Sequence, residues 1–538
     1  MFIIKPILVL VIILVSVTDS RADSYDPNNY LPPDCSVKLE ETNLPIVFID
    51  TQYGKESKTI IHKDWRVAAR IKIIINDNGV NYSDTTAHPG QKVDYEGWIA
   101  IKYRGYTSFS LSKKKPFSIK TMESSDPEGK KKKVCIMGLP KDNDWVLIAP
   151  YSDRSLIRDV LMFQLARPYL EFTPKVRHCE VILDGVYYGV YVMAEHISKG
   201  ENRLNLSEPG SAGDELTGDY HLEIDHLDEE HLYVSKYPTL DENGVPHGIP
   251  NSVCFQYKFP KYEDMVPGHE EQLEYIQKQI DLMEDALDSD HFSDAETGYR
   301  RYLDIMSFID HELSQEVSGN VDAYRLSTNI YKHRDSVDPR FKTTIWDFNL
   351  AFGNNRENNG ELTDYWLFLN KYINPAEKSK VPFWWARMMQ DPEYVKLLKA
   401  RWAQYRKENY SDEHLNNTID SLVAILDAKG ARERNYQAFP VWGENIWPVP
   451  NYNSVNTWEK EISYLKNWIK RRIAWMDEQL DYDPTTIGFG VMMPDATFKK
   501  EITGYYDSKG QRLEHPRKGI VIIKHSDGTS RILFVCGN

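Results

Sequence analysis

Cysteine is scarce in this sequence, and its spacing fits neither a disulfide scaffold nor a metal site. The 538 residues include five cysteines: Cys35, Cys135, Cys179, Cys254 and Cys536. Small disulfide-stabilised domains carry many cysteines in a short chain, and structural zinc sites need closely spaced pairs. Both classes of protein are therefore excluded, and an odd number leaves at least one thiol unpaired.

Basic residues are fewer than acidic ones, and the formal net charge is −15. Nucleic acids and anionic membranes attract basic proteins, so neither is expected as the main partner. Two local runs are exceptions, residues 113–115 and 130–133, which are all lysine. The second run has the pattern of a solvated loop. The first run, residues 113–115, adjoins a predicted strand.

Long apolar runs are missing beyond the first residues. Lys5, an apolar run at 7–17 and Ser20-Arg21-Ala22 form the pattern of a secretory signal cleaved after Ala22. A retained membrane anchor is the alternative, but the run is short for a membrane span. We expect residues 1–22 to be a signal peptide, with no transmembrane segment after cleavage and a secreted, periplasmic or cell-surface location.

The remaining chain is rich enough in apolar residues, at 41%, to bury a large core. Residues 23–205 predict a strand-rich lobe, because short apolar and polar alternations are separated by Gly and Asn turns. Residues 153–166 predict one helix that stops before Pro168. Asp184-Gly185 predicts a hairpin turn, since both residues tolerate positive φ.

The pattern changes to helices in residues 206–480. Apolar residues recur on one face at 273–287, 305–313 and 458–480, and Gly319 is expected to cap the second of these helices. Residues 481–538 predict a linker followed by short strands with Gly turns. The fold class is therefore α+β, with two lobes and a small C-terminal β tail.

The most informative stretch is residues 343–354, an apolar, strand-like run that contains Asp347. A carboxylate fixed at the end of a buried strand can hold a hard divalent cation near phosphate oxygens. Asp322 precedes Asp347 by 25 positions, and Asn329 lies between them on another predicted strand. Protein kinases place a catalytic Asp, an Asn, a hairpin and a metal-binding Asp in this order. A turn or helix cap is the alternative role for each residue.

Six segments of the chain together resemble the spore coat protein H (CotH) kinase family, in consistent order from about residue 44 to 477. They are residues 101–105 (IKYRG), 114–120 (KKPFSIK), 144–147 (DWVL), 155–159 (SLIRD), 189–195 (GVYVMAE) and 346–348 (WDF). The resemblance implies a secreted bacterial protein with a divergent protein-kinase-like fold that uses ATP and Mg²⁺ or Mn²⁺.

The same resemblance implies roles for particular residues. Asp347 and Asn329 would be metal ligands, and Asp322 would orient or deprotonate the acceptor hydroxyl. Lys120 and Arg104 would contact phosphates, and Glu195 would follow the strand beneath the adenine. For Lys120 an exposed strand end is the alternative, and for Arg104 an ion pair with a nearby carboxylate.

Several features depart from the kinase and family patterns. Asn329 follows Asp322 by seven positions where kinases have five, and Asn349 stands where the kinase motif has Gly. Tyr106 follows the Arg-Gly pair where the family has Asn or Ser, and His196 follows Glu195 where the family has Lys. The helix at 153–166 offers only Asp159 as an acid to orient Lys120.

Two function classes therefore remain. The first is an exported kinase that phosphorylates hydroxyl side chains of secreted or surface proteins, and the second is a catalytically silent surface, adhesion or structural protein. A third possibility is an enzyme that transfers another nucleotide-derived group, which would need similar contacts to phosphate and metal.

Overall fold

The computed structural model describes residues 30–227, 230–238, 252–369, 371–373 and 381–484, and four strands between residues 502 and 535. The predicted signal peptide and Cys536 lie outside the described residues. The chain forms two compact units. Unit 1 comprises residues 1–160, 174–204 and 420–461, and unit 2 comprises residues 161–173, 205–419 and 462–538.

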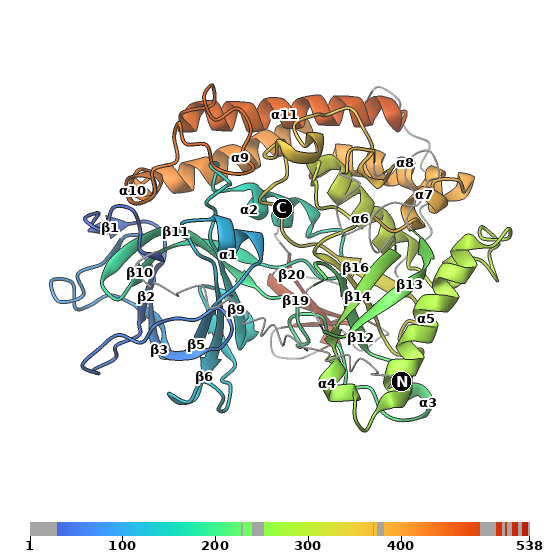
Figure 1. Ribbon diagram of the computed structural model, residues 1–538, viewed down its shortest axis with the longest axis horizontal. Helices are drawn as coiled ribbons and strands as arrows, with labels where there is room; N and C mark the ends of the chain where they lie inside the picture. The colour runs from blue at the N-terminus through green and yellow to red at the C-terminus, as the bar shows by residue number, and fades with distance from the viewer. Residues whose placement is uncertain are drawn as a thin grey trace, which may run out of the picture. The chain divides into compact units, whose positions relative to one another are not determined.

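Unit 1 is built on a closed barrel of seven strands (Figure 1). Around the barrel the order is β10-β11-β9-β6-β5-β3-β2, and every neighbouring pair is antiparallel except β2 with β10. The barrel strands are β2 Ile46–Asp50, β3 Val67–Ile74, β5 Val93–Tyr103, β6 Phe117–Met122, β9 Asp144–Ile148, β10 Val176–Leu183 and β11 Val186–Glu195. Apolar side chains that alternate along these strands fill the interior, which explains the sequence pattern.

The predicted hairpin is confirmed, because Asp184 and Gly185 join β10 to β11 with φ values of 50° and 80°. The smaller elements of unit 1 are β1 Glu41–Thr42, β4 Asn81–Tyr82, α1 Thr107–Leu111, β7 Val134–Ile136, β8 Leu139–Asp142 and α10 Ala431–Ala438. The helix predicted from residue 153 begins later, as α2 Arg158–Ala166. The Asp153 side chain accepts the N–H of Arg158, the first residue of α2, at 2.9 Å, so this acid lies before the helix and binds its N-terminal end.

Unit 2 combines helices with a five-stranded sheet in the order β13-β14-β12-β15-β16 (Figure 1). The strands are β12 Tyr220–Ile224, β13 Leu232–Pro238, β14 Ser252–Phe259, β15 Thr328–Lys332 and β16 Phe341–Thr344. The first three lie in an acidic stretch punctuated by Gly and Pro, for which the sequence predicts no elements. The predicted hairpin of β15 and β16 is confirmed.

The predicted helices of unit 2 are also present. They are α5 Glu270–Asp288, α6 Ile305–Ser318 and α11 Trp458–Gln479, of which α11 begins in unit 1. The Asp304 side chain accepts the Ser307 N–H at the start of α6, and Gly319 ends it with φ 57°, as expected of a C-terminal cap. The further helices are α3 Gly213–Leu216, α4 Tyr262–Met265, α7 Trp384–Met388, α8 Pro392–Lys407 and α9 Asp412–Asp427, which ends in unit 1, with single turns η2 Tyr299–Arg301, η3 Glu357–Asn359 and η4 Leu367–Leu369.

The C-terminal tail forms an antiparallel sheet in the order β18-β17-β19-β20, which confirms the predicted β tail. Its strands are β17 Ile502–Asp507, β18 Arg512–Leu513, β19 Gly519–His525 and β20 Ser530–Val535.

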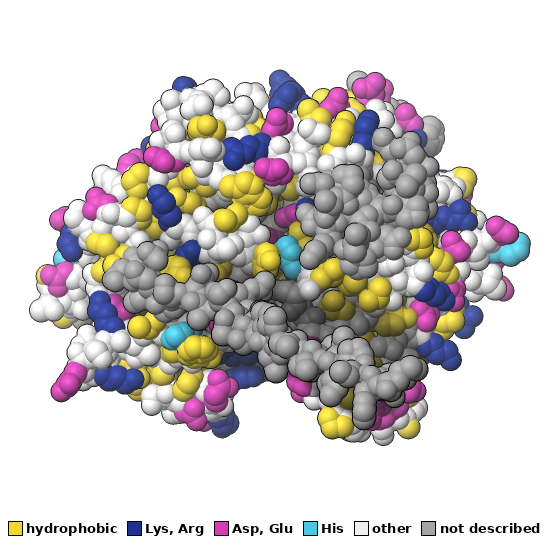
Figure 2. Space-filling model, in the orientation of Figure 1, with side chains coloured by type: hydrophobic (Ala, Val, Ile, Leu, Met, Phe, Trp, Pro, Cys, Tyr) yellow, Lys and Arg dark blue, Asp and Glu magenta, His cyan; other side chains and the backbone are white. Residues whose placement is uncertain are grey.

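Within the described residues, no helix is both long and apolar enough to span a bilayer. Of the cysteines, Cys35, Cys135, Cys179 and Cys254 are free thiols. On the face shown in Figure 2, acidic and basic side chains are interspersed.

A buried histidine connects three segments of unit 2. His333 follows β15, and its Nε2 lies 3.2 Å from Glu171 Oε1 while its Nδ1 lies 3.7 Å from Asp219 Oδ2. Lys342 also contacts Glu171, at 2.8 Å. Burial opposes the charge of His333, but the two carboxylates outweigh burial and raise its pKa to about 9.

Replacement of His333 by Gln should therefore destabilise the protein in a pH-dependent way. The folded pKa lies above the ordinary 6.5, so the contribution is complete below pH 6.5 and is lost as the pH rises through 9. We expect a loss of about 2 kcal/mol at pH 6 that shrinks at pH 9.5. Thermal unfolding at both pH values checks this, with exposed His414→Gln as the control. An equal loss at both pH values would contradict the assignment.

Candidate functional site

A row of hydrogen-bonded polar side chains crosses the sheet of unit 2. Glu223 on β12 lies opposite Asn329 on β15, and Asn329 Nδ2 donates to Glu223 Oε1 at 3.2 Å. His221 Nε2 lies 2.7 Å from Asn329 Oδ1, and Lys258 lies 2.9 Å from Glu223 Oε2. Asn329, predicted as a metal ligand, is thus held within a network between strands, next to a carboxylate.

A second carboxylate follows the same strand. Asp225 comes directly after β12, and burial together with the neighbouring charges of Glu223 and Asp347 raises its pKa well above the usual range. Burial also opposes the charge of Glu223, but Lys258 outweighs it and lowers the pKa of Glu223. The carboxylates of Glu223 and Asp347 therefore both act on Asp225 in unit 2.

Asp347 lies in a loop rather than at a strand end. The strand predicted to end at Asp347 ends earlier, at Thr344, the last residue of β16. Asp347 has a left-handed backbone with φ 62°, and its carbonyl accepts a hydrogen bond from Asn320 Nδ2 at 3.2 Å. Its neighbours Trp346 and Phe348 are buried and pack on Phe163. The apolar residues that suggested a strand thus anchor a strained loop, a conformation that is common at functional sites.

Asp322 lies in the turn between α6 and β15. Its Oδ1 pairs with Arg325 at 2.7 Å, and its side chain is 21% exposed while that of Arg325 is 4% exposed. Tyr324 and Ser327 in the same turn have positive φ values of 68° and 48°. The carboxylate is therefore held in a fixed orientation and remains accessible.

The polar residues of unit 2 suit a divalent cation that takes some of its oxygen ligands from a bound molecule rather than from the protein. Among the described residues, no group of three or more His, Cys, Asp or Glu side chains is arranged to hold a metal ion by itself. Mg²⁺ commonly takes only one or two carboxylates from the protein and the rest of its ligands from phosphates and water. Burial and the neighbouring carboxylates raise the pKa of Asp225, and a bound divalent cation would favour its charged form.

Unit 1 places Lys120 beside an acid that the kinase pattern does not predict. Lys120 on β6 lies 3.8 Å from Asp144 on β9, and the two residues are cross-strand partners. Asp144 also lies 3.7 Å from His196 Nδ1. Burial opposes the charge of Asp144, but His196 and Lys120 outweigh it and lower its pKa. The acid beside Lys120 thus comes from β9 and not from α2.

The remaining predicted residues of unit 1 have different surroundings. Glu195 is buried at the end of β11, where Oε1 binds Arg203 at 2.6 Å and Oε2 accepts the Lys175 N–H at 2.8 Å. Arg104 is partly exposed, and its N–H donates to the Pro116 carbonyl at 3.1 Å. Tyr106 is 60% exposed. Glu195 therefore belongs to an ion pair in the barrel, whereas Arg104 lies at the surface.

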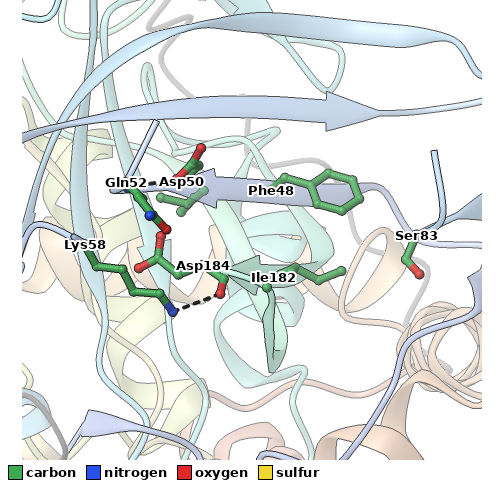
Figure 3. A pocket seen from close by; sticks show the side chains of 9 residues that line it. Phe48, Asp50, Gln52, Lys58, Ser83, Ile182 and Asp184 are labelled. Carbon is green, nitrogen blue, oxygen red and sulfur yellow. Dashed lines mark hydrogen bonds between the residues drawn. The ribbon is translucent and has the colours of Figure 1, made fainter. Parts of the chain in front are cut away.

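A hollow of about 380 Å³ on unit 1 offers no comparable chemistry (Figure 3). Its lining residues are Phe48, Ile49, Asp50, Gln52, Lys58, Ser83, Ile182, Asp184 and Gly185. The carboxylate of Asp184 accepts from Thr51, that of Asp50 accepts from the Gln52 and Tyr53 N–H groups, and Lys58 donates to the Asp184 carbonyl. The charged groups that line this hollow are therefore engaged in hydrogen bonds that stabilise the local structure.

The structure adds Glu223, Asp225 and Asp144 to the residues predicted from sequence. The sequence predicts no strand at Glu223 and Asp225, and their alternate spacing indicates a shared face only once β12 is known. Asp144 had no local signal either, since its relation to Lys120 depends on strand pairing.

A comparison with known protein families matches the part of the chain that contains the candidate site residues. A protein-family model described as CotH kinase protein matches residues 101–476. The chain matches no curated protein at a significant level.

Proposed function

Because the chain belongs to the CotH kinase protein family, we propose that it is an exported protein kinase that transfers the γ-phosphoryl group of ATP to hydroxyl side chains of secreted or surface proteins. Membership of this family implies use of ATP and a protein substrate. The observation that carries the proposal is that Asp347 and Glu223 both act on the buried Asp225 in unit 2, while Asn329 donates to Glu223 at 3.2 Å.

In this proposal Asp347 and Asn329 supply oxygen ligands for Mg²⁺ or Mn²⁺, and Glu223 and Asp225 add negative charge. When bound, the metal neutralises charge on the phosphates of ATP. Asn329 is oriented by His221 and Glu223, so its amide is fixed before any ligand arrives.

Asp322 acts on the acceptor. Its carboxylate, oriented by Arg325, accepts a hydrogen bond from the acceptor hydroxyl and takes its proton as the oxygen attacks phosphorus. The fixed turn matters because such a base must lie within hydrogen-bond distance of the hydroxyl that it activates.

For unit 1 we propose that Lys120 and Arg104 contact phosphate oxygens. Lys120 is held by Asp144 on the neighbouring strand, so its ammonium group has a defined position. Glu195 contributes indirectly, since its ion pair with Arg203 fixes the end of β11. Export rests on the signal-like pattern of residues 1–22.

Transfer of label from γ-labelled ATP tests the proposal. The purified chain without residues 1–22 is incubated with ATP, either metal, and a panel of peptides containing Ser, Thr or Tyr. We expect ADP and phosphorylated peptide or phosphorylated chain. Incorporation of the adenosine moiety would indicate nucleotidyl transfer instead. Absence of any product with both metals would favour a binding protein without catalytic activity.

A further inference from the structure

One face of α11 binds the backbone of the segment that follows Asp347. Three side chains spaced four residues apart each contact a carbonyl oxygen. The Tyr464 hydroxyl donates to Gly353 at 2.8 Å, and Trp468 Nε1 donates to Glu361 at 3.0 Å. Arg472 Nη1 donates to Thr363 at 3.1 Å and to Tyr365 at 2.6 Å. Residues four apart lie on the same side of a helix, so these side chains form one binding face.

Arg472 and Glu316 extend this contact as a buried ion pair. Arg472 Nη2 lies 2.8 Å from Glu316 Oε2, and Arg472 Nε donates to the Glu316 carbonyl at 2.7 Å. Glu316 in turn accepts the N–H groups of Leu367 at 3.0 Å and Phe368 at 3.1 Å. Both side chains are 1% exposed or less. The pair is therefore satisfied mainly by backbone groups of the segment, and loss of either member would leave a buried charge unpaired.

Trp468 lies against two glycines with left-handed backbones. A Cβ atom at Gly319 (φ 57°) or at Gly353 (φ 74°) would overlap the indole ring. Gly319 lies three residues before Asp322, and Gly353 lies six residues after Asp347. Trp468 thus contacts both loops that lead to the proposed catalytic and metal-binding carboxylates.

The two loops are also bonded to each other. The Phe352 N–H donates to the Ser318 carbonyl at 2.6 Å, and Asn320 Nδ2 donates both to Gln315 Oε1 at 3.1 Å and to the Asp347 carbonyl at 3.2 Å. A shift of the segment along α11 would therefore move Asp347 relative to Asp322.

We propose that Tyr464, Trp468 and Arg472, which we call the α11 clamp, are positioning residues that set the separation of Asp322 and Asp347 for phosphoryl transfer. This inference rests on the proposed function. The clamp touches neither nucleotide nor acceptor. It acts through the Gly319 and Gly353 loops and through the backbone of residues 361–368.

The experiment combines hydrogen exchange with kinetics in Arg472→Lys, which keeps the charge but cannot make the forked contacts of Arg. We expect exchange at the Leu367 and Phe368 amides to rise by about 10-fold or more. We expect kcat to fall by about 10² while the affinity for metal and ATP changes by less than about threefold, since small misplacements affect the chemical step most. Lys470→Ala, an exposed position on the same helix, is the matched control.

Tyr464→Phe provides a milder variant if Arg472→Lys does not fold, because it removes one hydroxyl from a partly exposed side chain. Its expected effects are smaller and in the same direction. Unchanged exchange in residues 347–368 in a folded variant would overturn the clamp, as would a loss of ATP affinity equal to the loss of kcat. If the unmodified chain transfers no phosphoryl group, the proposed function fails, while the exchange data still decide whether the clamp holds the segment.

Discussion

Asp347→Asn is expected to reduce phosphoryl transfer by at least about 10³-fold, because the variant lacks the anionic oxygen proposed to hold the metal against the phosphates of ATP. The same change removes a negative charge that raises the pKa of the neighbouring Asp225, so the melting temperature without metal should stay the same or rise. If the variant is stable but inactive, the Asp347 carboxylate serves function rather than the fold. The measurement is the initial rate of transfer at saturating metal, together with thermal unfolding.

Asp290→Asn is the matched control, since Asp290 is exposed beyond α5 and should leave the rate and stability unchanged. A fall in melting temperature of Asp347→Asn by several degrees would show that the side chain serves the fold. Full activity of that variant would remove Asp347 from the metal site.

Asp322→Asn is expected to lower kcat by about 10² to 10³ without weakening metal-dependent binding of ATP. An amide keeps the size of the side chain and its contact surface with Arg325, but it cannot accept the proton of the attacking hydroxyl. The split between kcat and ATP affinity is therefore the informative result, and it is measured by steady-state rates beside equilibrium binding. Equal losses in both quantities would mean that Asp322 binds the nucleotide rather than serving the acceptor.

The sequence predicts those parts of the fold that depend on local patterns. The hairpin at Asp184-Gly185 and the end of α6 at Gly319 follow from backbone preferences at single residues, and both are present. Helices α5, α6 and α11 follow from apolar periodicity. The same reasoning places Asp322, Asn329 and Asp347 around one hairpin.

The parts that the sequence does not predict depend on contacts between distant segments. The partner of Lys120 is Asp144 because β6 pairs with β9, and no periodicity within either strand reveals that register. Strands β12 to β14 lie in a stretch whose acids and turn residues favour loops, and tertiary pairing overrides that local preference. The apolar residues up to Trp346 predict a strand that leads directly to Asp347, whereas Trp346 and Phe348 pack on Phe163 from a loop.

Calorimetric titration of ATP into the chain without residues 1–22, with and without Mg²⁺ or Mn²⁺, tests the central claim most directly. The account predicts binding that requires a divalent metal, and loss of that metal dependence in Asp347→Asn. Absence of ATP binding with either metal, or binding of equal affinity without metal, would contradict it.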